Sequence, residues 1–350
     1  AVVFVEPGNY IVEANGASGM HISLTAPAPE IAPEASLKTD YGAKGDAVYQ
    51  YATDGSVTVT SGTDDTQALL DAMSDFAAGI ISSLFVSAGN YWIDSSQIDC
   101  PSNTNIFGAG PDATKFVMST TNPNLNLFVG FYAGARVSNL HFSGFKVIGS
   151  KTDDNLIGGT GIFTFGTTGV TIDNVHSEGS KGLAWLGNDN VAGGRKFGTK
   201  DAFLTRLRVD DCKLFSVYIR GNENPDAAAL PEDDTNNINV DGLIIRGSNV
   251  GFVIAEGLPF NIKLSNYDCQ DTDNLLQIES CYDVHIDTFH ISRATSQWNA
   301  LTPAPFKLQW QIAGSDNIHF TNGHIDSELQ AFAFPLNNRG CKNVTFESIT

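Results

Sequence analysis

The chain has 350 residues, 42% of them apolar, which is enough for a large hydrophobic core and excludes disorder as its main state. Its 20 basic and 39 acidic residues give a net charge of −19, which argues against a nucleic-acid or anionic-membrane surface, because both need clustered Lys and Arg. No apolar run approaches the ~18 residues of a membrane span. The five cysteines lack CxxC spacing, so we expect buried free thiols and no zinc site. The sequence contains no P-loop and no Rossmann fingerprint, so we expect no cofactor.

Residues 1–36 are predicted to form a separate connector. Two short apolar runs are followed by APAPEIAPEAS, and such Pro/Ala-rich stretches form extended linkers. The chain does not begin with Met and shows no signal-peptide pattern, so we expect an upstream part in the native protein.

One helix is predicted, beginning at Asp64 and Asp65. Either carboxylate is placed to cap the exposed amides of the first turn. The apolar residues that follow at helical spacing are Ala68, Leu69, Leu70, Ala72, Met73 and Phe76. The preceding residues 47–63 are predicted to form a hairpin around Thr53-Asp54-Gly55. After Gly79 the chain takes on strand character in ISSLFVSAGNYWI.

From residue 135 onward the sequence repeats. The copies begin at residues 135, 170, 207, 238, 262, 284, 318 and 344. Each copy has an apolar residue in third place: Val137, Ile172, Val209, Val240, Leu264, Ile286, Phe320 and Phe346. Two places later comes a turn-forming residue: Asn139, Asn174, Asp211, Gly242, Asn266, Thr288, Asn322 and Ser348.

A second strand follows each of these, as in GIFTFG, KGLAWLG, FSVYIRG, VGFVIAEG, NLLQIES and PFKLQWQ. A period of ~20–40 residues made of short strands is typical of a solenoid, here a parallel β-helix. The last copy stops in mid-unit at Thr350. Because soluble proteins cover unpaired strand edges, we expect further sequence or a partner chain there.

Four segments near the start, LKTDYGAKGD, DDTQALLDAM, LFVSAGNYWI and IFGAGPDATKFVM, resemble the opening of the pectate-lyase-like superfamily, in particular bacteriophage tailspike depolymerases. The letter-level match covers only the first ~80 of residues 37–350. The resemblance implies an all-β fold, a right-handed parallel β-helix with a short N-terminal capping helix. It also implies a homotrimer that binds, and often cleaves, a bacterial surface polysaccharide. The Asp and Gly residues of the motif are expected to be structural.

A β-helix has a packed core, so a site must lie on its outward rows and loops. If Leu186, Ile219, Ile254, Ile278 and Leu308 point inward, alternation leaves an outward row of candidate substrate-binding residues. Its polar and aromatic members are Trp185, Tyr218, Arg220, Gln277, Glu279, Lys307 and Gln309. In the resembled family this strand commonly floors the substrate groove.

Glu279 and Glu256 are the predicted catalytic residues. They lie on neighbouring strands, ~6 Å apart by strand spacing plus one residue of shift. Glycoside hydrolysis needs two carboxyl groups separated by ~5–9.5 Å. The alternative is a surface charge ladder with Lys307.

Two loops supply further candidates. The loop 221–237 carries Asp233 among five acidic residues and either walls the groove or is simply solvated. The loop 292–305 carries Arg293 and Trp298, which suit sugar contacts or, for Trp298, a subunit interface.

The first strands present two more outward rows. One is predicted to contain Asp173, Asp210, Asp241, Ser265 and Asp287, and its neighbour Thr171, Arg208, Asn239, Lys263 and His285. Their opposite signs favour a neutralised solvated face or a trimer contact. The other histidines, His176, His290 and His324, lack metal-ligand spacing and are interpreted as surface or core residues.

We therefore predict a phage tailspike that depolymerises a surface polysaccharide by glycoside hydrolysis, located in the virion tail and joined to other tail proteins through its terminal regions. Two alternatives remain on the same fold: a polysaccharide lyase using Arg220, Lys307 and Arg293, and a receptor-binding spike without activity. A secreted monomeric cell-wall enzyme is a third.

Overall fold

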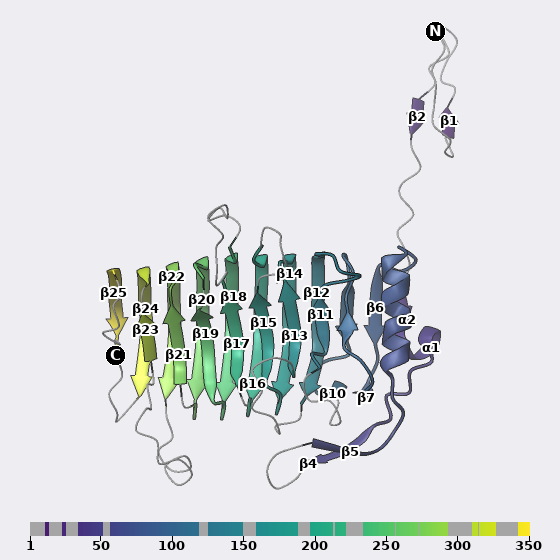
Figure 1. Cartoon of the computed structure of the whole chain (residues 1–350), viewed down its shortest axis with the longest axis horizontal. Helices are drawn as coiled ribbons and strands as arrows, with labels where there is room; N and C mark the ends of the chain where they lie inside the picture. The colour runs from purple at the N-terminus through teal and green to yellow at the C-terminus, as the bar shows by residue number, and fades with distance from the viewer. Residues whose placement is uncertain are drawn as a thin grey trace.

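The protein is a solenoid of short strands stacked along one long axis (Figure 1). The computed structural model describes residues 11–13, 23–25, 34–51, 57–118, 125–149, 159–187, 197–212, 214–221, 234–255, 257–272, 274–292, 310–313, 315–326 and 342–350. Two parallel sheets, of thirteen and eight strands, run the length of the solenoid. The predicted right-handed parallel β-helix is thereby confirmed.

The larger sheet carries both short and long strands. Its members are β3 (Glu34–Ser36), β6 (Ser83–Val86), β7 (Gly89–Ile93), β9 (Asn105–Gly108), β10 (Thr114–Met118), β12 (Ser138–Ile148), β14 (Thr168–Glu178), β16 (Lys200–Asp210), β18 (Asn236–Arg246), β20 (Phe260–Gln270), β22 (Tyr282–Ser292), β24 (Asp316–Asp326) and β25 (Lys342–Ile349). Strands β12 to β24 in this sheet have eleven residues each.

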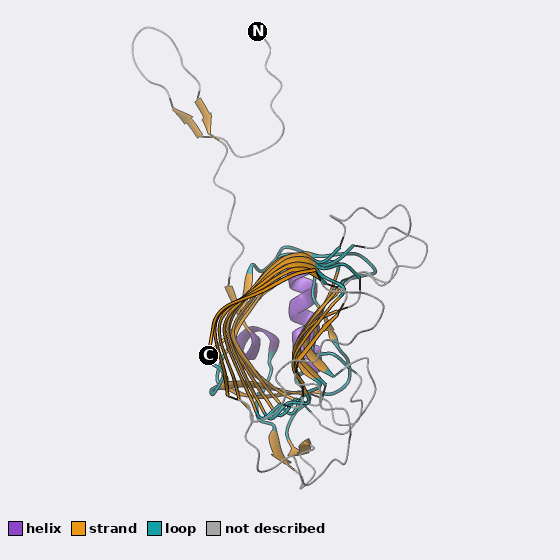
Figure 2. Cartoon of the chain, turned by 90° about the vertical axis from the view of Figure 1, so that its left-hand side faces the viewer, coloured by secondary structure: helices purple, strands orange, loops and turns teal. Residues whose placement is uncertain are grey.

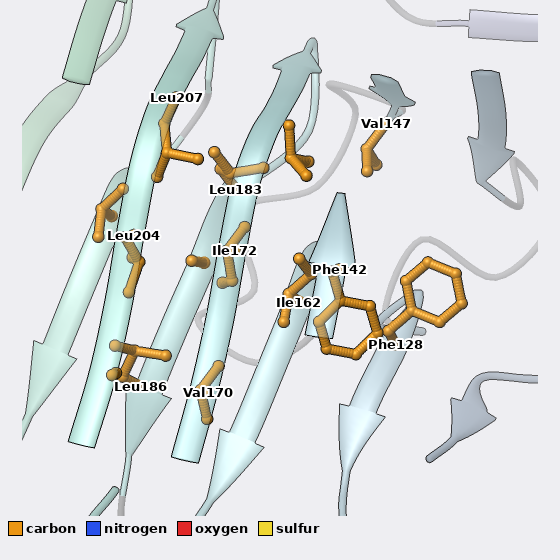
Figure 3. Packing of buried hydrophobic residues seen from close by; sticks show 14 of the residues in the cluster. Phe128, Phe142, Val147, Ile162, Val170, Ile172, Leu183, Leu186, Leu204 and Leu207 are labelled. Atoms are coloured by element: carbon orange, nitrogen blue, oxygen red, sulfur yellow. The ribbon is translucent and has the colours of Figure 1, made fainter. Parts of the chain in front are cut away.

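The smaller sheet contains the second strand of each coil. Its members are β8 (Ile98–Asp99), β11 (Phe128–Gly130), β13 (Thr160–Phe165), β15 (Gly182–Gly187), β17 (Phe215–Arg220), β19 (Val250–Ala255), β21 (Asn274–Glu279) and β23 (Trp310–Ala313). Viewed from the end, the two sheets face each other across a core (Figure 2). Leu183 and Leu186 of one sheet lie against Ile172 and Leu204 of the other, fully buried (Figure 3).

Two helices lie at the N-terminal end of the solenoid (Figure 1). The predicted helix is α2 (Thr66–Ala77), and its buried face includes Leu69, Met73 and Phe76. The sequence analysis missed α1 (Leu37–Tyr41), although Ser36 caps it and Gly42 ends it with a φ of 75°. A serine at the N-cap and a glycine directly after the last turn are the sequence signal of such a five-residue helix.

The hairpin predicted for residues 47–63, between the GAKGD and DDT segments, is confirmed. Strand β4 (Val48–Tyr51) pairs antiparallel with β5 (Val57–Ser61). Val57 of the hairpin is buried against Val117 and Ile148, on the outer surface of the first coils. A second hairpin, β1 (Ile11–Glu13) and β2 (Ser23–Thr25), falls within the predicted connector. The larger sheet begins at Glu34, slightly ahead of the predicted start at residue 37.

Left-handed residues bend every eleven-residue strand at two points. Near the middle of each strand the bend falls at Gly144, Asn174, Arg206, Gly242, Asn266, Thr288 and Asn322. Near the strand starts it falls at Asn139, Gly169, Asp201, Asn237, Asn261, Asp283 and Asn317, and β25 has the corresponding residues Asn343 and Ser348. Asn, Asp and Gly dominate both columns because they tolerate positive φ.

The predicted register is wrong in two copies of the repeat. Ile172 pairs with Phe142 and Leu204, not with Val137 and Val209. The turn residues of those copies, Asn139 and Asp211, do have positive φ but belong to other corners of the coil. The remaining copies pair as predicted.

The cysteines of the described segments are free, buried thiols, as predicted: Cys100, Cys212, Cys269 and Cys281. Burial raises the pKa of Cys269 to about 11 and that of Cys212 to about 12, so both stay protonated and unreactive near neutral pH. Within the described residues no helix is both long and apolar enough to cross a membrane.

Candidate functional site

On the outer face of the eight-stranded sheet, the strand register forms two parallel rows of residues. In the first row, strand pairing aligns Val129, Phe163, Trp185, Tyr218, Val253, Gln277 and Gln311. In the second, two residues further along each strand, it aligns Phe165 with Gly187, Arg220 with Ala255, and Glu279 with Ala313. The rows change from aromatic to polar along the solenoid.

Glu279 lies at the polar end of these rows. Ile278 before it is fully buried, so alternation turns Glu279 and Gln277 outward, and both are partly exposed. The Gln277 side-chain amide donates a hydrogen bond to Glu279 Oε1 at 3.0 Å. This bond fixes the direction of the carboxyl group.

Arg220 shares the second row with Glu279. Ala255 separates them, which places their backbones ~10 Å apart at two strand spacings. The Arg220 guanidinium carbon lies 5.8 Å from the centre of the Trp185 ring, a cation–π contact. The two rows thus hold a cation and a carboxyl group facing the same side, with a small residue between them.

Trp185 and Tyr218, predicted as outward substrate-binding residues, are not exposed to a substrate. They are only 7% and 4% exposed. Their ring centres lie 4.8 Å apart, and Phe163 lies 5.0 Å from Trp185 on the other side. With Val253 these rings form a second hydrophobic cluster on the outside of the sheet. The alternation of inward and outward residues correctly predicted that these side chains face away from the main core. It carries no information on whether other residues cover them.

The predicted alignment of Lys307 and Gln309 with the residues of β21 is wrong. The strand that pairs with β21 is Trp310–Ala313, so Gln311, not Lys307 or Gln309, stands beside Gln277. Lys307 precedes that strand and lies outside the described residues, as do Glu256, Asp233, Arg293 and Trp298. The distance between Glu279 and Glu256 therefore stays a prediction.

The predicted acidic row on the larger sheet needs one correction. Asp173, Asp241, Ser265 and Asp287 lie in one row, but Thr205 takes the place given to Asp210. In the neighbouring row, Phe203, 49% exposed, takes the place given to Arg208. Groups on the next strand bind the carboxylates of the acidic row: Arg206 forms an ion pair with Asp173, and Ser265 and Asn266 donate hydrogen bonds to Asp241 at 2.9 and 2.7 Å.

The hydrogen bonds to Asp287 in this row lead us to predict that the protein loses stability in acid. Hydrogen bonds from Thr321, Asn322 and Thr288 lower the pKa of Asp287 below its usual value. A carboxyl group with a lowered pKa stabilises the fold above its unfolded-state pKa of ~4, and this contribution is lost as pH falls below that value. Asp287→Asn is expected to flatten the decline of the urea midpoint between pH 5 and pH 3. Asp112→Asn, at an exposed carboxylate in the turn before β10, is the control, and an equally steep decline in both variants would contradict the prediction.

The sequence analysis missed a hollow at the middle bend of the larger sheet. Its volume is about 640 Å³, and His290 and His324 line one side. Their rings stack 5.4 Å apart, and His290 Nδ1 lies 3.3 Å from Asp268 Oδ1. A signal was present, because β22 and β24 both carry two histidines five residues apart. Among the described residues, no group of three or more His, Cys, Asp or Glu is arranged to hold a metal ion.

No family model and no curated protein sequence matches the chain. Among solved structures, the N-terminal fragment of bacteriophage phi29 gene product 12 is similar with a TM-score of 0.56 and 14% identity, over 90% of this chain and 57% of that one. The catalytic domain of a GH87 α-1,3-glucanase variant in complex with nigerose has a TM-score of 0.55 and 17% identity, over 87% and 60%. An iota-carrageenase complexed to iota-carrageenan fragments has a TM-score of 0.53 and 14% identity, over 83% and 57%. These similarities show the fold, and the chain spans 57% to 60% of the length of these three structures.

Proposed function

We propose that this chain belongs to a phage tailspike that binds and depolymerises a bacterial surface polysaccharide by glycoside hydrolysis. The observation that carries the proposal is the polar end of the outer rows, where Gln277 holds Glu279 at the surface and Arg220 faces the same side. The fold supports it, because phi29 gene product 12 and the carrageenase and glucanase structures have the same architecture.

In this proposal Glu279 acts as the carboxylate and Glu256 as the acid. The hydrogen bond donated by Gln277 to Oε1 orients the Glu279 carboxyl group, and a positioned carboxylate suits a base or nucleophile. Glu256 follows Ala255, the residue that stands between Arg220 and Glu279 in the second row. A protonated Glu256 then gives its proton to the oxygen of the leaving sugar, while Glu279 activates water or attacks the anomeric carbon.

The other predicted residues take supporting roles. Arg220 and Gln277 bind sugar oxygens at the edge of the groove, and Trp185 holds the Arg220 guanidinium through its ring face. Tyr218 packs against Trp185 instead of stacking on sugar. Lys307, Arg293, Trp298 and Asp233 are proposed to wall the groove. Assembly as a homotrimer, attachment to other tail proteins and a place in the virion tail belong to the same proposal.

Arg220 gives specific support to a second candidate, a polysaccharide lyase. A lyase neutralises the acid group of a uronate with a cation while a base removes the neighbouring proton. Arg220 and Glu279 face the same side within ~10 Å, close enough to contact one sugar unit and its neighbour.

The test is mass spectrometry of oligosaccharides released from a panel of purified bacterial surface polysaccharides. Products that carry an added water support hydrolysis, and products that carry an unsaturated sugar support the lyase. Binding without release from any polysaccharide supports a receptor-binding spike and contradicts the enzymatic proposal. Absence of both binding and release across the panel contradicts the proposed function as a whole.

A further inference from the structure

The hollow at the middle bend of the larger sheet, here called the corner hollow, crosses strands β18, β20, β22, β24 and β25. Ile244, Asp268, His290 and His324 form one side, and the bend residues that include Asn266 and Asn322 form the other. It is a separate place from the rows that carry Glu279, which lie on the eight-stranded sheet.

Two glycines open the floor of the corner hollow. Gly242 stands at a bend with a φ of 75°, where a side chain would be strained. At Gly323 there is no space for a side chain, because a Cβ there would lie 2.0 Å from the Phe289 ring. The Phe289 ring fills the place of the missing side chain, so the hollow has an aromatic and backbone floor. A volume of about 640 Å³ is within the range of ligand sites.

The charges around the corner hollow are already paired. Arg246 forms an ion pair with Asp268, and the backbone carbonyl of Asp268 accepts a second bond from Arg246 at 3.1 Å. His290 lies against the same carboxylate. The described lining contains no Lys or Arg. An anionic ligand would find no unpaired cation here, so the hollow suits a ligand without formal charge.

The remaining groups of the lining suit sugar. The His290 and His324 imidazoles are polar at the edge and flat on the face, and Ile244 is 37% exposed beside them. His324 Nδ1 lies 3.1 Å from the Thr350 hydroxyl, so a line of hydrogen-bonding groups borders an apolar floor. Flat faces beside hydrogen-bonding edges are what the apolar face and hydroxyl groups of a sugar ring require.

We infer that the corner hollow is a second saccharide-binding site, which holds an uncharged stretch of glycan away from the cleavage groove. The inference rests on the proposed function, because it assigns the hollow to the polysaccharide that the protein depolymerises. Two sites on one chain raise the affinity for a long polysaccharide without raising the affinity for a short fragment.

The chain supplies its own matched control for the test. His285 and His319 stack 4.7 Å apart on the same two strands, β22 and β24, but outside the hollow. The full chain with Glu279→Gln is labelled with ¹³C at histidine Cε1, and its signals are assigned by single His→Gln variants. Oligosaccharides of four to six units from dextran, from laminarin and from the bacterial panel are then titrated, with iota-carrageenan fragments as the anionic probe.

We expect an uncharged oligosaccharide to shift the signals of His290 and His324 and to leave those of His285 and His319 in place. We also expect His290→Ala with His324→Ala to weaken binding of the long polysaccharide about tenfold, while His285→Ala with His319→Ala leaves it unchanged.

Three results would overturn the inference. The first is a polysaccharide that the native chain cleaves but that leaves the His290 and His324 signals of the Glu279→Gln chain fixed, and this leaves the proposed function intact. The second is a shift caused only by iota-carrageenan fragments. The third is a shift on dilution of the protein alone, which assigns the hollow to a contact between copies. If an uncharged oligosaccharide shifts both signals and no polysaccharide is cleaved, the site stands and the proposed function fails.

Discussion

Replacing Glu279 by Gln is expected to lower the rate of polysaccharide cleavage by about 10²- to 10⁴-fold, the contribution of one positioned acid or base. The change keeps the size of the side chain and removes its charge. The Gln277 amide, which donates to Glu279 Oε1 in the native protein, can still donate to the new amide oxygen. The fold around Ile278 is undisturbed, so the loss falls on the chemical step. The rate of appearance of reducing ends measures it.

Three comparisons make this result specific to the site. Glu34→Gln removes an exposed carboxylate at the N-terminal end of the solenoid and is expected to leave the rate unchanged. Glu256→Gln is expected to cause a loss of similar size, because the two carboxyl groups act as a pair and their effects are not additive. Binding of the polysaccharide is expected to persist in both site variants. Cleavage at the native rate by the Glu279→Gln variant would show that the site lies elsewhere.

Much of this fold was predictable because the corners of a β-helix require residues that tolerate positive φ, and such residues recur visibly in the sequence. Asn174, Asn266 and Asn322 were identified as turn residues, and all three have positive φ. The register failed at Val137 and Val209, because each coil has more than one left-handed corner and the same polar–apolar pattern surrounds them all. The pattern locates corners and does not say which corner of the coil each one is.

The candidate site was predictable only in part, for two physical reasons. Alternation along a strand placed Glu279 and Gln277 outward, since Ile278 between them had to face the core. Alternation does not show whether an outward side chain is covered by other residues, so the burial of Trp185 could not be predicted. Nor does alternation fix where a strand begins, and β23 starts at Trp310, beyond Lys307.

The opening motif supports a prediction of stability at the other end of the molecule. Asp65 is 2% exposed, and its carboxylate accepts backbone hydrogen bonds from Lys44 at 2.7 Å and Gly45 at 3.0 Å. The second Asp of the DDT motif thus ties the start of α2 to the GAKGD loop, which is the structural role expected of the motif. Burial raises the pKa of Asp65 and so offsets part of this gain, because the charged form is less well solvated.

Asp65→Ala is therefore expected to destabilise the N-terminal coils by about 3 kcal/mol, the net value of two hydrogen bonds to a charged group. A solenoid transmits such a loss mainly to neighbouring coils, since each coil contacts only the next. Amide hydrogen exchange is expected to speed up across residues 37–93 and to stay unchanged across residues 236–292. Asp71→Ala, at an exposed position of the same helix, is expected to change neither. Unchanged exchange in residues 37–93 of the Asp65→Ala variant would mean that packing of α2 alone holds this end of the solenoid, and that the carboxylate serves another purpose.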